Sequence, residues 1–313
     1  MERKYKCANG VIERTRYAVA DNATPRGKRK KGNTSFRKQE ANNNSAVRRA
    51  ARILNCNYGH DNGLLLTLDY HDAALDRLIG KLGEENQKTL HALRLPVGKV
   101  GTWKTPEKAK LQKLEERADR AMDALKDAAE PELTNWIRRI RRKTGAELKI
   151  LSVTSDMDGQ TGEIVRVHHH VVLAVGGNAD ANSISWDLLR SEWKNGCVDI
   201  QQLRNQRDYT PIASYLLRQV RHKADAKKYR VSRGMVMPEI SEREVLSHAE
   251  IKAPAGAVVV ERSEFSVETV TQYIRYIPKE IAYRNNDGRN AMDEREKTAT
   301  VCRESIAMTD KRR

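Results

Sequence analysis

Three consecutive histidines, His168, His169 and His170, lie within the apolar segment Val167–Val175. Alternate side chains of a strand share a face, so His168 and His170 are expected to project together with their Cβ atoms roughly 7 Å apart. Two imidazoles at that spacing can bind one divalent metal ion, with a carboxylate or water completing the shell. His169 is expected to point to the opposite face, toward the helices. The alternative is a histidine-rich strand whose rings form hydrogen bonds within the core.

The second residue with chemical potential is Tyr215, one turn into a helix that the pair Thr210-Pro211 is expected to open. Arg218 and Gln219 follow at i+3 and i+4 and therefore share its face. A tyrosine hydroxyl near a metal-bound phosphate can act as a nucleophile, because the metal neutralises phosphoryl charge and stabilises the displaced oxygen. A neighbouring cation such as Arg218 favours the phenolate form. The alternative is an ordinary amphipathic helix with a buried tyrosine.

The surrounding pattern predicts the elements that must position these residues. The apolar run at 64–70 predicts a buried strand, and residues 148–154 and 163–175 predict a hairpin around a turn-rich segment. Further expected elements are two helices opening at 105 and 131, a helix over 185–194, a strand over 197–203 and a helix from 210 to about 221.

In chain order these elements form a βαββαβ unit. Such a unit predicts an α+β fold of the ferredoxin-like type, with a four-stranded antiparallel sheet and helices on one face. The first and third strands are expected side by side in the centre. The open face of the sheet is then available for chemistry or for nucleic acid.

Positive charge is concentrated near the N-terminus. The chain of 313 residues has a net charge of +16, and residues 1–52 hold fifteen Lys and Arg against four acidic residues. Residues 22–44 show no helical or strand period, which indicates a mobile arm. A cationic arm is typical of polyphosphate binding, although a solubilising tail has the same composition.

These patterns divide the chain into three parts. We expect a basic, partly flexible N-terminal arm over residues 1–58, a central domain over 59–237, and a partly disordered C-terminal extension over 238–313. Within the extension, residues 251–260 favour a strand and residues 267–283 a helix.

Several classes of protein are excluded. No run of 18 apolar residues could form a spanning helix, and the N-terminus lacks the apolar segment of a secretory signal. The absence of a Walker motif excludes an appended ATP-driven helicase. The cysteines lie far apart without a CxxC pair, which disfavours a disulfide framework or zinc knuckle and favours the reducing cytoplasm; they are Cys7, Cys56, Cys197 and Cys302.

Three motifs resemble those of rolling-circle replication initiators in the His-hydrophobic-His (HUH) endonuclease superfamily. The likeness is greatest to the replication-associated proteins of bacterial plasmids and phages grouped with the filamentous-phage gene II protein. Leu64–Tyr70 (LLLTLDY) resembles the first motif, Val167–Val172 (VHHHVV) the metal-binding motif, and Ile212–Gln219 (IASYLLRQ), with Lys228–Met235 after it, the nucleophile helix. The resemblance spans about residues 30–238.

The resemblance implies a role for each matching residue. His168 and His170 become ligands of Mg²⁺ or Mn²⁺, and Tyr215 becomes the nucleophile. Arg218 stands where the family usually has Lys; Arg keeps the charge but does not give up its proton. Asp69 replaces a Thr of the first motif and is a candidate third ligand. Weaker rivals for that position are Asp156, Asp158 and Glu163.

The implied reaction is nicking and rejoining of single-stranded origin DNA. Tyr215 would attack the scissile phosphate, leaving a 5′-phosphotyrosyl link and a free 3′-hydroxyl primer. The implied partners are origin DNA and a host helicase and DNA polymerase in the bacterial cytoplasm. A second tyrosine motif, Tyr276-Ile277-Pro278-Lys279, is discounted because Pro278 would break a helix there.

Three alternatives remain open. A conjugative relaxase places its tyrosine before the metal motif, whereas Tyr215 follows it. A transposase of the same superfamily is usually a shorter chain. A non-catalytic DNA-binding protein with the same fold would account for Arg218 and Asp69 as departures from the family pattern.

Overall fold

The computed structural model describes residues 1–18, 36–58, 63–92, 108–176, 184–203, 206–220, 228–245, 250–266 and 271–282. Two five-stranded antiparallel sheets and seven helices make up this part of the chain, so the α+β prediction is confirmed. Sheet A has the strand order β8-β1-β2-β10-β9, and sheet B has the order β6-β3-β5-β4-β7. The sequence predicted only one of these two sheets.

Sheet B contains the strands that the sequence predicted. Its members are β3 (Gly63–Asp69), β4 (Leu148–Met157), β5 (Ile164–Val175), β6 (Val198–Leu203) and the short β7 (Arg230–Val231). β4 and β5 pair as a hairpin, and β3 lies between β5 and β6. The first and third predicted strands are therefore neighbours, which confirms their expected adjacency.

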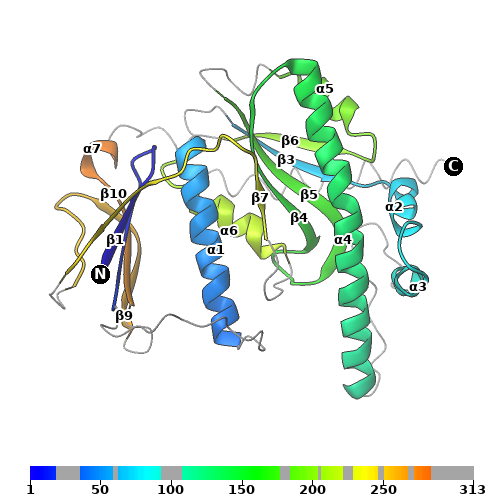
Figure 1. Cartoon of the computed structure of the whole chain (residues 1–313), viewed down its shortest axis with the longest axis horizontal. Helices are drawn as coiled ribbons and strands as arrows, with labels where there is room; N and C mark the ends of the chain where they lie inside the picture. Colours follow the sequence, from blue (N-terminus) through cyan, green and yellow to red (C-terminus); the bar gives the residue numbers. More distant parts are fainter. Residues whose placement is uncertain are drawn as a thin grey trace.

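Helices cover both faces of sheet B, and not one face as expected (Figure 1). On one side lie α2 (Asp72–Ile79), α3 (Glu84–Ala92), α4 (Lys108–Thr144) and α5 (Trp186–Glu192), around a core that includes Leu66, Trp136 and Val171. On the other side α1 (Phe36–Asn57) and α6 (Thr210–Arg218) pack on Leu65, Leu151 and Val172. The face that was expected to be open is thus covered by α1 and α6 (Figure 1).

α4 is one helix of 37 residues where the sequence predicted two. Pro131 lies inside it, although a proline in a helix interior costs about 3 kcal/mol or more. The apolar stripe continues across that proline, with Leu125, Ala129, Leu133 and Trp136 all buried against sheet B. Burial of this continuous stripe offsets the lost hydrogen bond.

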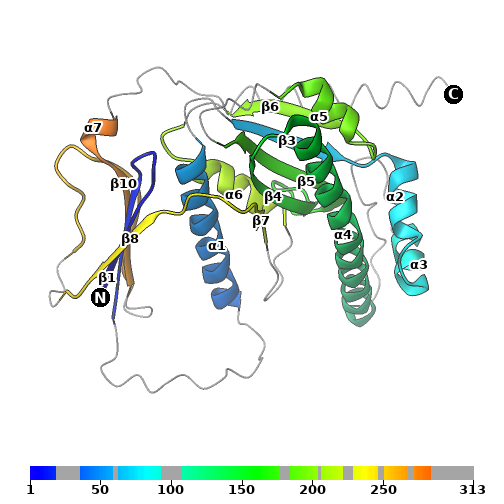
Figure 2. The ribbon, with the colours of Figure 1, turned by 45° about the horizontal axis from the view of Figure 1, so that its top comes forward.

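Sheet A joins the two ends of the chain. Its strands are β1 (Glu2–Lys6), β2 (Ile12–Tyr17), β8 (Glu239–Arg243), β9 (Val258–Ser266) and β10 (Thr271–Ile277), followed by the short helix α7 (Lys279–Ala282). Figure 2 shows this sheet beside α1, opposite sheet B. The N-terminal strands pair with β8 and β10 across more than 200 residues of sequence.

Sheet A changes the expected division of the chain. Residues 1–58, expected as an arm, contain β1, β2 and the long helix α1, while residues 19–35 of that arm lie outside the described part. The helix expected over 267–283 is wrong, because β10 occupies Thr271–Ile277. Both faces of β10 are buried, so its sequence lacks the period-2 alternation that marks a half-exposed strand. Residues 283–313 lie outside the described part.

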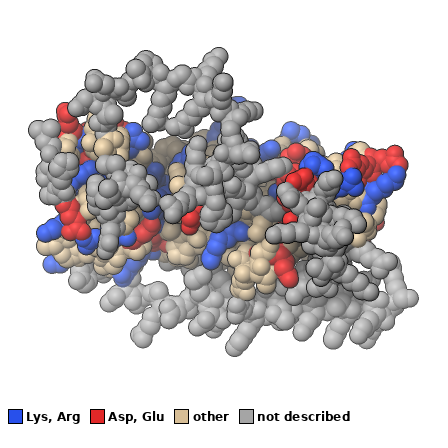
Figure 3. Space-filling model, turned by 90° about the horizontal axis from the view of Figure 1, so that it is seen from below, with Lys and Arg blue, Asp and Glu red and all other residues tan. Residues whose placement is uncertain are grey.

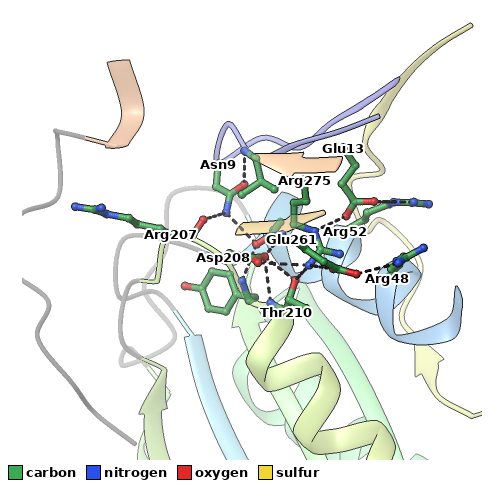
Figure 4. Close-up of polar contacts among 12 residues, drawn as sticks. Asn9, Glu13, Arg48, Arg52, Arg207, Asp208, Thr210, Glu261 and Arg275 are labelled. Carbon is green, nitrogen blue, oxygen red and sulfur yellow. Dashed lines mark hydrogen bonds and ion pairs between the residues drawn. The ribbon is translucent and has the colours of Figure 1, made fainter. Parts of the chain in front are cut away.

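A buried polar junction connects sheet A to α1 and to the start of α6 (Figure 4). Arg275 of β10 is fully buried; its Nε donates to Glu13 at 3.1 Å, and its Nη1 lies 3.2 Å from the Glu261 carboxylate and 3.5 Å from that of Asp208. Arg52 and Arg48 of α1 complete the junction by pairing with Glu13 and Glu261.

The same two arginines of α1 also stack on tyrosines of sheet A. The Cζ atom of Arg52 lies 3.5 Å from the ring centroid of Tyr5, and that of Arg48 lies 3.7 Å from that of Tyr273. Such contacts stabilise desolvated cations. Together with the ion pairs they fix sheet A to the helical layer of sheet B.

Both signs of charge are interleaved on the surface of the molecule seen from below, including the end formed by sheet A (Figure 3). Among the described residues, no helix has the length and apolar character needed to cross a membrane.

Candidate functional site

The two outer histidines of the triplet meet on one face of sheet B. The register pairs His168 with Asp69 and His170 with Thr67, so these four side chains share the face that α6 covers. The Nε2 atoms of His168 and His170 lie 3.1 Å apart, and their ring centroids lie 4.7 Å apart. This geometry agrees with the predicted pairing of His168 and His170.

Gln219, the residue that ends α6, supplies a third group to the pair. Its Oε1 atom lies 2.9 Å from His170 Nε2 and 3.4 Å from His168 Nε2. The sequence placed Gln219 on the same helix face as Tyr215, but it gave no reason to assign it to the histidines. The i+4 spacing from the tyrosine was the one available signal.

The protonation of His168 follows from its neighbours. Its Nδ1 lies 2.8 Å from the carbonyl oxygen of Arg166, which can only accept, so Nδ1 carries the proton. The Nε2 atom of a neutral His168 is then an unprotonated acceptor that faces Gln219. Hydrogen bonds of this kind fix the tautomer of metal-binding histidines.

His170 is held neutral by its surroundings. Burial is the largest cause, and the nearby His168 adds to it; together they lower the pKa of His170 to about 3, although the hydrogen bond with Gln219 acts in the other direction. Its Nδ1 atom lies 3.1 Å from Thr67 Oγ1. The Thr67 hydroxyl fits two tautomers of His170. With Nδ1 accepting from it, Nε2 carries the proton and donates to Gln219 Oε1; with Nδ1 donating to it, Nε2 is an acceptor that faces the same oxygen.

In the second of these tautomers, three acceptor atoms converge on one point. Two imidazole nitrogens and an amide oxygen in mutual contact repel one another unless a proton or a cation lies between them. Imidazole ligands suit divalent transition metals such as Zn²⁺ and Fe²⁺, and carbonyl and water ligands suit Mg²⁺ and Mn²⁺. The residues present therefore fit a divalent metal bound by His168, His170 and Gln219.

Tyr215 lies next to this cluster. Its ring centroid is 5.6 Å from that of His170, and its side chain is 43% exposed. Tyr215 is therefore open to solvent while its ring remains in contact with His170. The expected alternative of a buried tyrosine does not describe this side chain.

Both ends of α6 are fixed, and this sets the positions of Tyr215 and Gln219. At the C-terminal end, the backbone N–H groups of Asp156 and Met157 donate to the carbonyl of Gln219 at 3.3 and 3.2 Å, where the register of β4 shifts. At the start, Thr210 Oγ1 accepts from Arg275 Nη1 at 2.5 Å and donates to Asp208 at 2.8 Å. The position of α6 thus depends on contacts with both sheets.

His169 points to the other face, as predicted. It is fully buried; its Nε2 lies 2.8 Å from the Tyr70 hydroxyl and its Nδ1 lies 3.0 Å from Thr154 Oγ1. Burial lowers the pKa of His169 to about 3, with smaller contributions from His168 and His170. The core-hydrogen-bond alternative describes His169, and the buried His170 also has a polar partner at each ring nitrogen, Thr67 and Gln219.

Arg218 does not join the cluster. Its side chain is exposed, and its Nε donates to the carbonyl of Ser214 at 3.4 Å. It contributes positive charge on the accessible side of α6, one residue before Gln219.

Asp69 lies opposite His168 in the strand register, but its side chain is exposed. Within the described residues its carboxylate forms no hydrogen bond with either histidine, whereas the amide oxygen of Gln219 contacts both. The weaker candidates are also elsewhere. Asp156 is paired with Lys126 at 3.1 Å, and Asp158 accepts backbone hydrogen bonds within the turn between β4 and β5, where Glu163 is exposed.

The described part of the chain holds no group of three or more His, Cys, Asp or Glu side chains that could bind a metal ion. The cluster here has two histidines, and its third group is an amide, which lies outside that set. Comparisons with family models, curated proteins and solved structures find no match to this chain.

Proposed function

We propose that this protein nicks and rejoins single-stranded DNA at a replication origin through Tyr215, as a rolling-circle initiator of the HUH type. The observation that carries the proposal is the convergence of His168, His170 and Gln219 beside the exposed Tyr215. Cleavage by a tyrosine needs an accessible hydroxyl and a group that neutralises the scissile phosphate, and both features meet here.

The strand order of sheet B supports the finer fold assignment. The order β6-β3-β5-β4 is that of a ferredoxin-like βαββαβ core, to which β7 adds an edge strand. The histidine pair lies on the central strand β5 and the tyrosine on the helix that follows the last core strand. The order of the motifs along the chain, with the tyrosine after the histidines, favours an initiator over a relaxase.

In the proposed reaction His168, His170 and Gln219 would hold Mg²⁺ or Mn²⁺. The bound ion supplies Lewis-acid polarisation of the scissile phosphate. The Arg166 carbonyl keeps the proton of His168 on Nδ1, and burial keeps His170 neutral, so both Nε2 atoms remain available as ligands. Arg218 adds a cation on the accessible side of α6.

Tyr215 forms the new bond to phosphorus as the bond from phosphorus to the 3′-oxygen breaks. Because Tyr215 is an exposed residue, its proton can pass to solvent, and the departing 3′-oxygen gains a proton. The products are a 5′-phosphotyrosyl link and a free 3′-hydroxyl, which a polymerase can extend. Attack by a 3′-hydroxyl on the same link rejoins the strand, so neither step consumes ATP.

The proposal is tested by strand cleavage. Single-stranded DNA from the genetic element that encodes the protein is incubated with Mn²⁺ or EDTA and with wild-type or Tyr215→Phe protein. We expect cleaved strand only with Mn²⁺ and wild-type protein. Tight DNA binding without cleavage on any segment would favour a non-catalytic DNA-binding protein. Cleavage that survives the Phe substitution would show that another residue is the nucleophile.

The proposed setting follows from the same resemblance. An initiator of this kind acts in the bacterial cytoplasm with a host helicase and DNA polymerase. Both a plasmid and a phage would supply the circular template that rolling-circle replication needs.

A further inference from the structure

The two faces of sheet A differ in their charge balance. The inner face packs on α1, where Arg48, Arg52 and Arg275 are balanced by Glu13, Asp208 and Glu261. We define the outer face by the strand residues that the register places on the opposite side. Its cations are Lys4, Lys6, Arg14, Arg16, Arg243 and Arg262, and its acids are Glu2 and Glu239.

A pocket of about 400 Å³ lies on this outer face, over β1, β2 and β8. Its lining consists of three cations (Lys4, Arg14 and Arg243), two carboxylates (Glu2 and Glu242) and the hydroxyl-bearing residues Ser241 and Tyr276. The segment that includes Ile251 covers the β10 side of the face, because Ile251 packs on Ile274 and Tyr276 and its N–H donates to Gln272. The part of the outer face that stays open lies over β1, β2 and β8, where Lys4, Arg14, Arg16 and Arg243 are located.

A buried carboxylate organises the cations of the pocket. Glu2 is 3% exposed and receives hydrogen bonds from Arg14 at 2.9 Å, Arg16 at 2.8 Å and Arg243 at 3.2 Å. Burial would raise the pKa of Glu2, but the hydrogen bonds from Arg16 and Arg14 outweigh it and hold that pKa below its usual value. One carboxylate therefore fixes three guanidinium groups. The second lining carboxylate, Glu242, pairs with Arg3, so the cations around the pocket still outnumber its acids.

Lys4 adds a further cation that this carboxylate does not neutralise. Within the described residues its ammonium group has no ion pair or hydrogen bond, although its side chain is only half-exposed. Lys4 lies directly opposite Ser241, and Arg243 follows two residues along the same neighbouring strand. The two cations are therefore diagonal neighbours about 7–8 Å apart at Cα, far enough to contact separate anionic groups.

We propose that the outer face of sheet A binds the phosphodiester backbone of double-stranded DNA, away from the nicking site. Preorganised guanidinium groups and a free ammonium are the groups that bind backbone phosphates. The one aromatic residue that lines the pocket, Tyr276, is 4% exposed. Without an exposed ring on which unpaired bases can stack, the surface suits a duplex backbone better than a single strand. This inference rests on the proposed function only in naming DNA as the polyanion.

The test compares two double variants of the full-length protein. Lys4→Gln/Arg243→Gln removes the two cations with free donors and leaves Glu2, Arg14 and Arg16 in place. Lys88→Gln/Arg190→Gln is the matched control, since it removes one exposed Lys and one exposed Arg from α3 and α5. Binding of a fluorescein-labelled 25-base-pair duplex is measured by anisotropy over a range of KCl concentrations, and thermal melting checks that both variants are folded.

We expect the pocket variant to bind the duplex about tenfold more weakly than wild type at 0.1 M salt, with a log–log salt slope smaller by about two. The control variant should keep the wild-type slope. An unchanged slope in the pocket variant, or an equal loss in the control, overturns the proposal. Binding of phosphatidylserine vesicles through Lys4 and Arg243 without duplex binding also overturns it, in favour of a lipid surface.

Cleavage of a single-stranded oligonucleotide by the same preparations separates this inference from the proposed function. If the pocket variant cleaves normally and only its duplex binding is weakened, the nicking proposal and the DNA-binding face are both supported. If no preparation cleaves but duplex binding depends on Lys4 and Arg243, the nicking proposal fails and the DNA-binding face stands. If cleavage occurs and duplex binding does not depend on these residues, the inference fails alone.

Discussion

At the scale of single residues, the candidate site depends on three polar side chains, each oriented by a contact with a neighbouring group. His168 is oriented by the Arg166 carbonyl, His170 by Thr67, and Gln219 by the end of α6. The central residue His169 has a different task, because its two nitrogens contact Tyr70 and Thr154 in the core. The outer two histidines therefore face α6 and the candidate site, while His169 forms hydrogen bonds on the opposite face of sheet B.

Gln219→Ala tests the third ligand. Loss of the amide oxygen should weaken Mn²⁺ binding by at least about tenfold, comparable with the loss of a residue that orients a ligand. Free Mn²⁺ is measured by electron paramagnetic resonance during a titration. Gln201→Ala on β6, a glutamine hydrogen-bonded to Asp199 and outside the cluster, is the control. Equal affinities for wild type and Gln219→Ala would remove Gln219 from the site.

The two buried histidines also predict acid sensitivity. Their folded pKa values are about 3, below the unfolded value of about 6.5, so between these limits the unfolded chain binds more protons. Stability is therefore complete above pH 6.5 and falls as the pH drops toward 3, by up to about 1.4 kcal/mol per pH unit for each histidine.

His169→Leu isolates one of these contributions. The variant should show a smaller pH dependence of its unfolding free energy between pH 4.5 and 6, by about one proton, whatever its stability at pH 7. Urea unfolding at several pH values measures this slope, and the carboxylates contribute equally to both proteins. A slope identical to that of wild type would mean that His169 is protonated in the folded state.

At the scale of elements, α6 is the part of the molecule that brings tyrosine and amide to the histidines. Its apolar face, with Ile212, Ala213, Leu216 and Leu217, packs between α1 and sheet B. Its start is tied to sheet A by Arg275, and its end to the shifted register of β4. A helix of nine residues is short enough that these ties decide where its side chains point.

Arg275→Met should be strongly destabilising. It would leave the buried Glu13 and the nearly buried Asp208 without one of their cations, a type of change that costs about 3–5 kcal/mol. Arg190→Met, at an exposed pair on α5, should cost at most about 1 kcal/mol. Urea unfolding of both variants measures the difference, and similar small losses would show that the junction does not hold sheet A in place.

The sequence could predict those elements that carry a hydrophobic period or a helix cap within a short segment. β3, the β4–β5 hairpin, α5, β6 and α6 each carry a period or a cap within a few residues, and they were predicted. Gln219 was not assigned to the site, because its position depends on where α6 ends against β4. Sheet A was missed for a related reason: Glu2 pairs with Arg243, and neither segment indicates the other.

At the scale of the whole molecule, strands from the N-terminal and C-terminal parts of the described chain pair in one sheet. β1 and β2 from the N-terminus and β8 to β10 from the C-terminal part form one sheet, and that sheet holds the start of α6. The two sheets are joined through α1, which contacts sheet A with Arg48 and Arg52 and sheet B with Ala50 and Leu54. A boundary at residue 238 therefore cuts through one folded body.

A chain truncated after Pro238 tests this closure. It loses β8, β9 and β10, leaving β1 and β2 as an isolated hairpin, which is marginally stable at best. We expect the truncated chain to melt well below the full chain, with early loss of helical signal from α1 and α6. Circular dichroism during heating measures both, and a fragment that melts at the full-length temperature would establish sheet A as a separate domain.

The most direct measurement of the central claim is the site of covalent attachment to DNA. After cleavage in Mn²⁺ the protein is digested with trypsin, and the peptide Asp208–Arg218, which contains both Tyr209 and Tyr215, is sequenced by mass spectrometry. We predict a nucleotide attached through phosphate to the exposed Tyr215, and none on the buried Tyr209. A nucleotide on any other residue, or its persistence on this peptide in the Tyr215→Phe protein, would contradict the account.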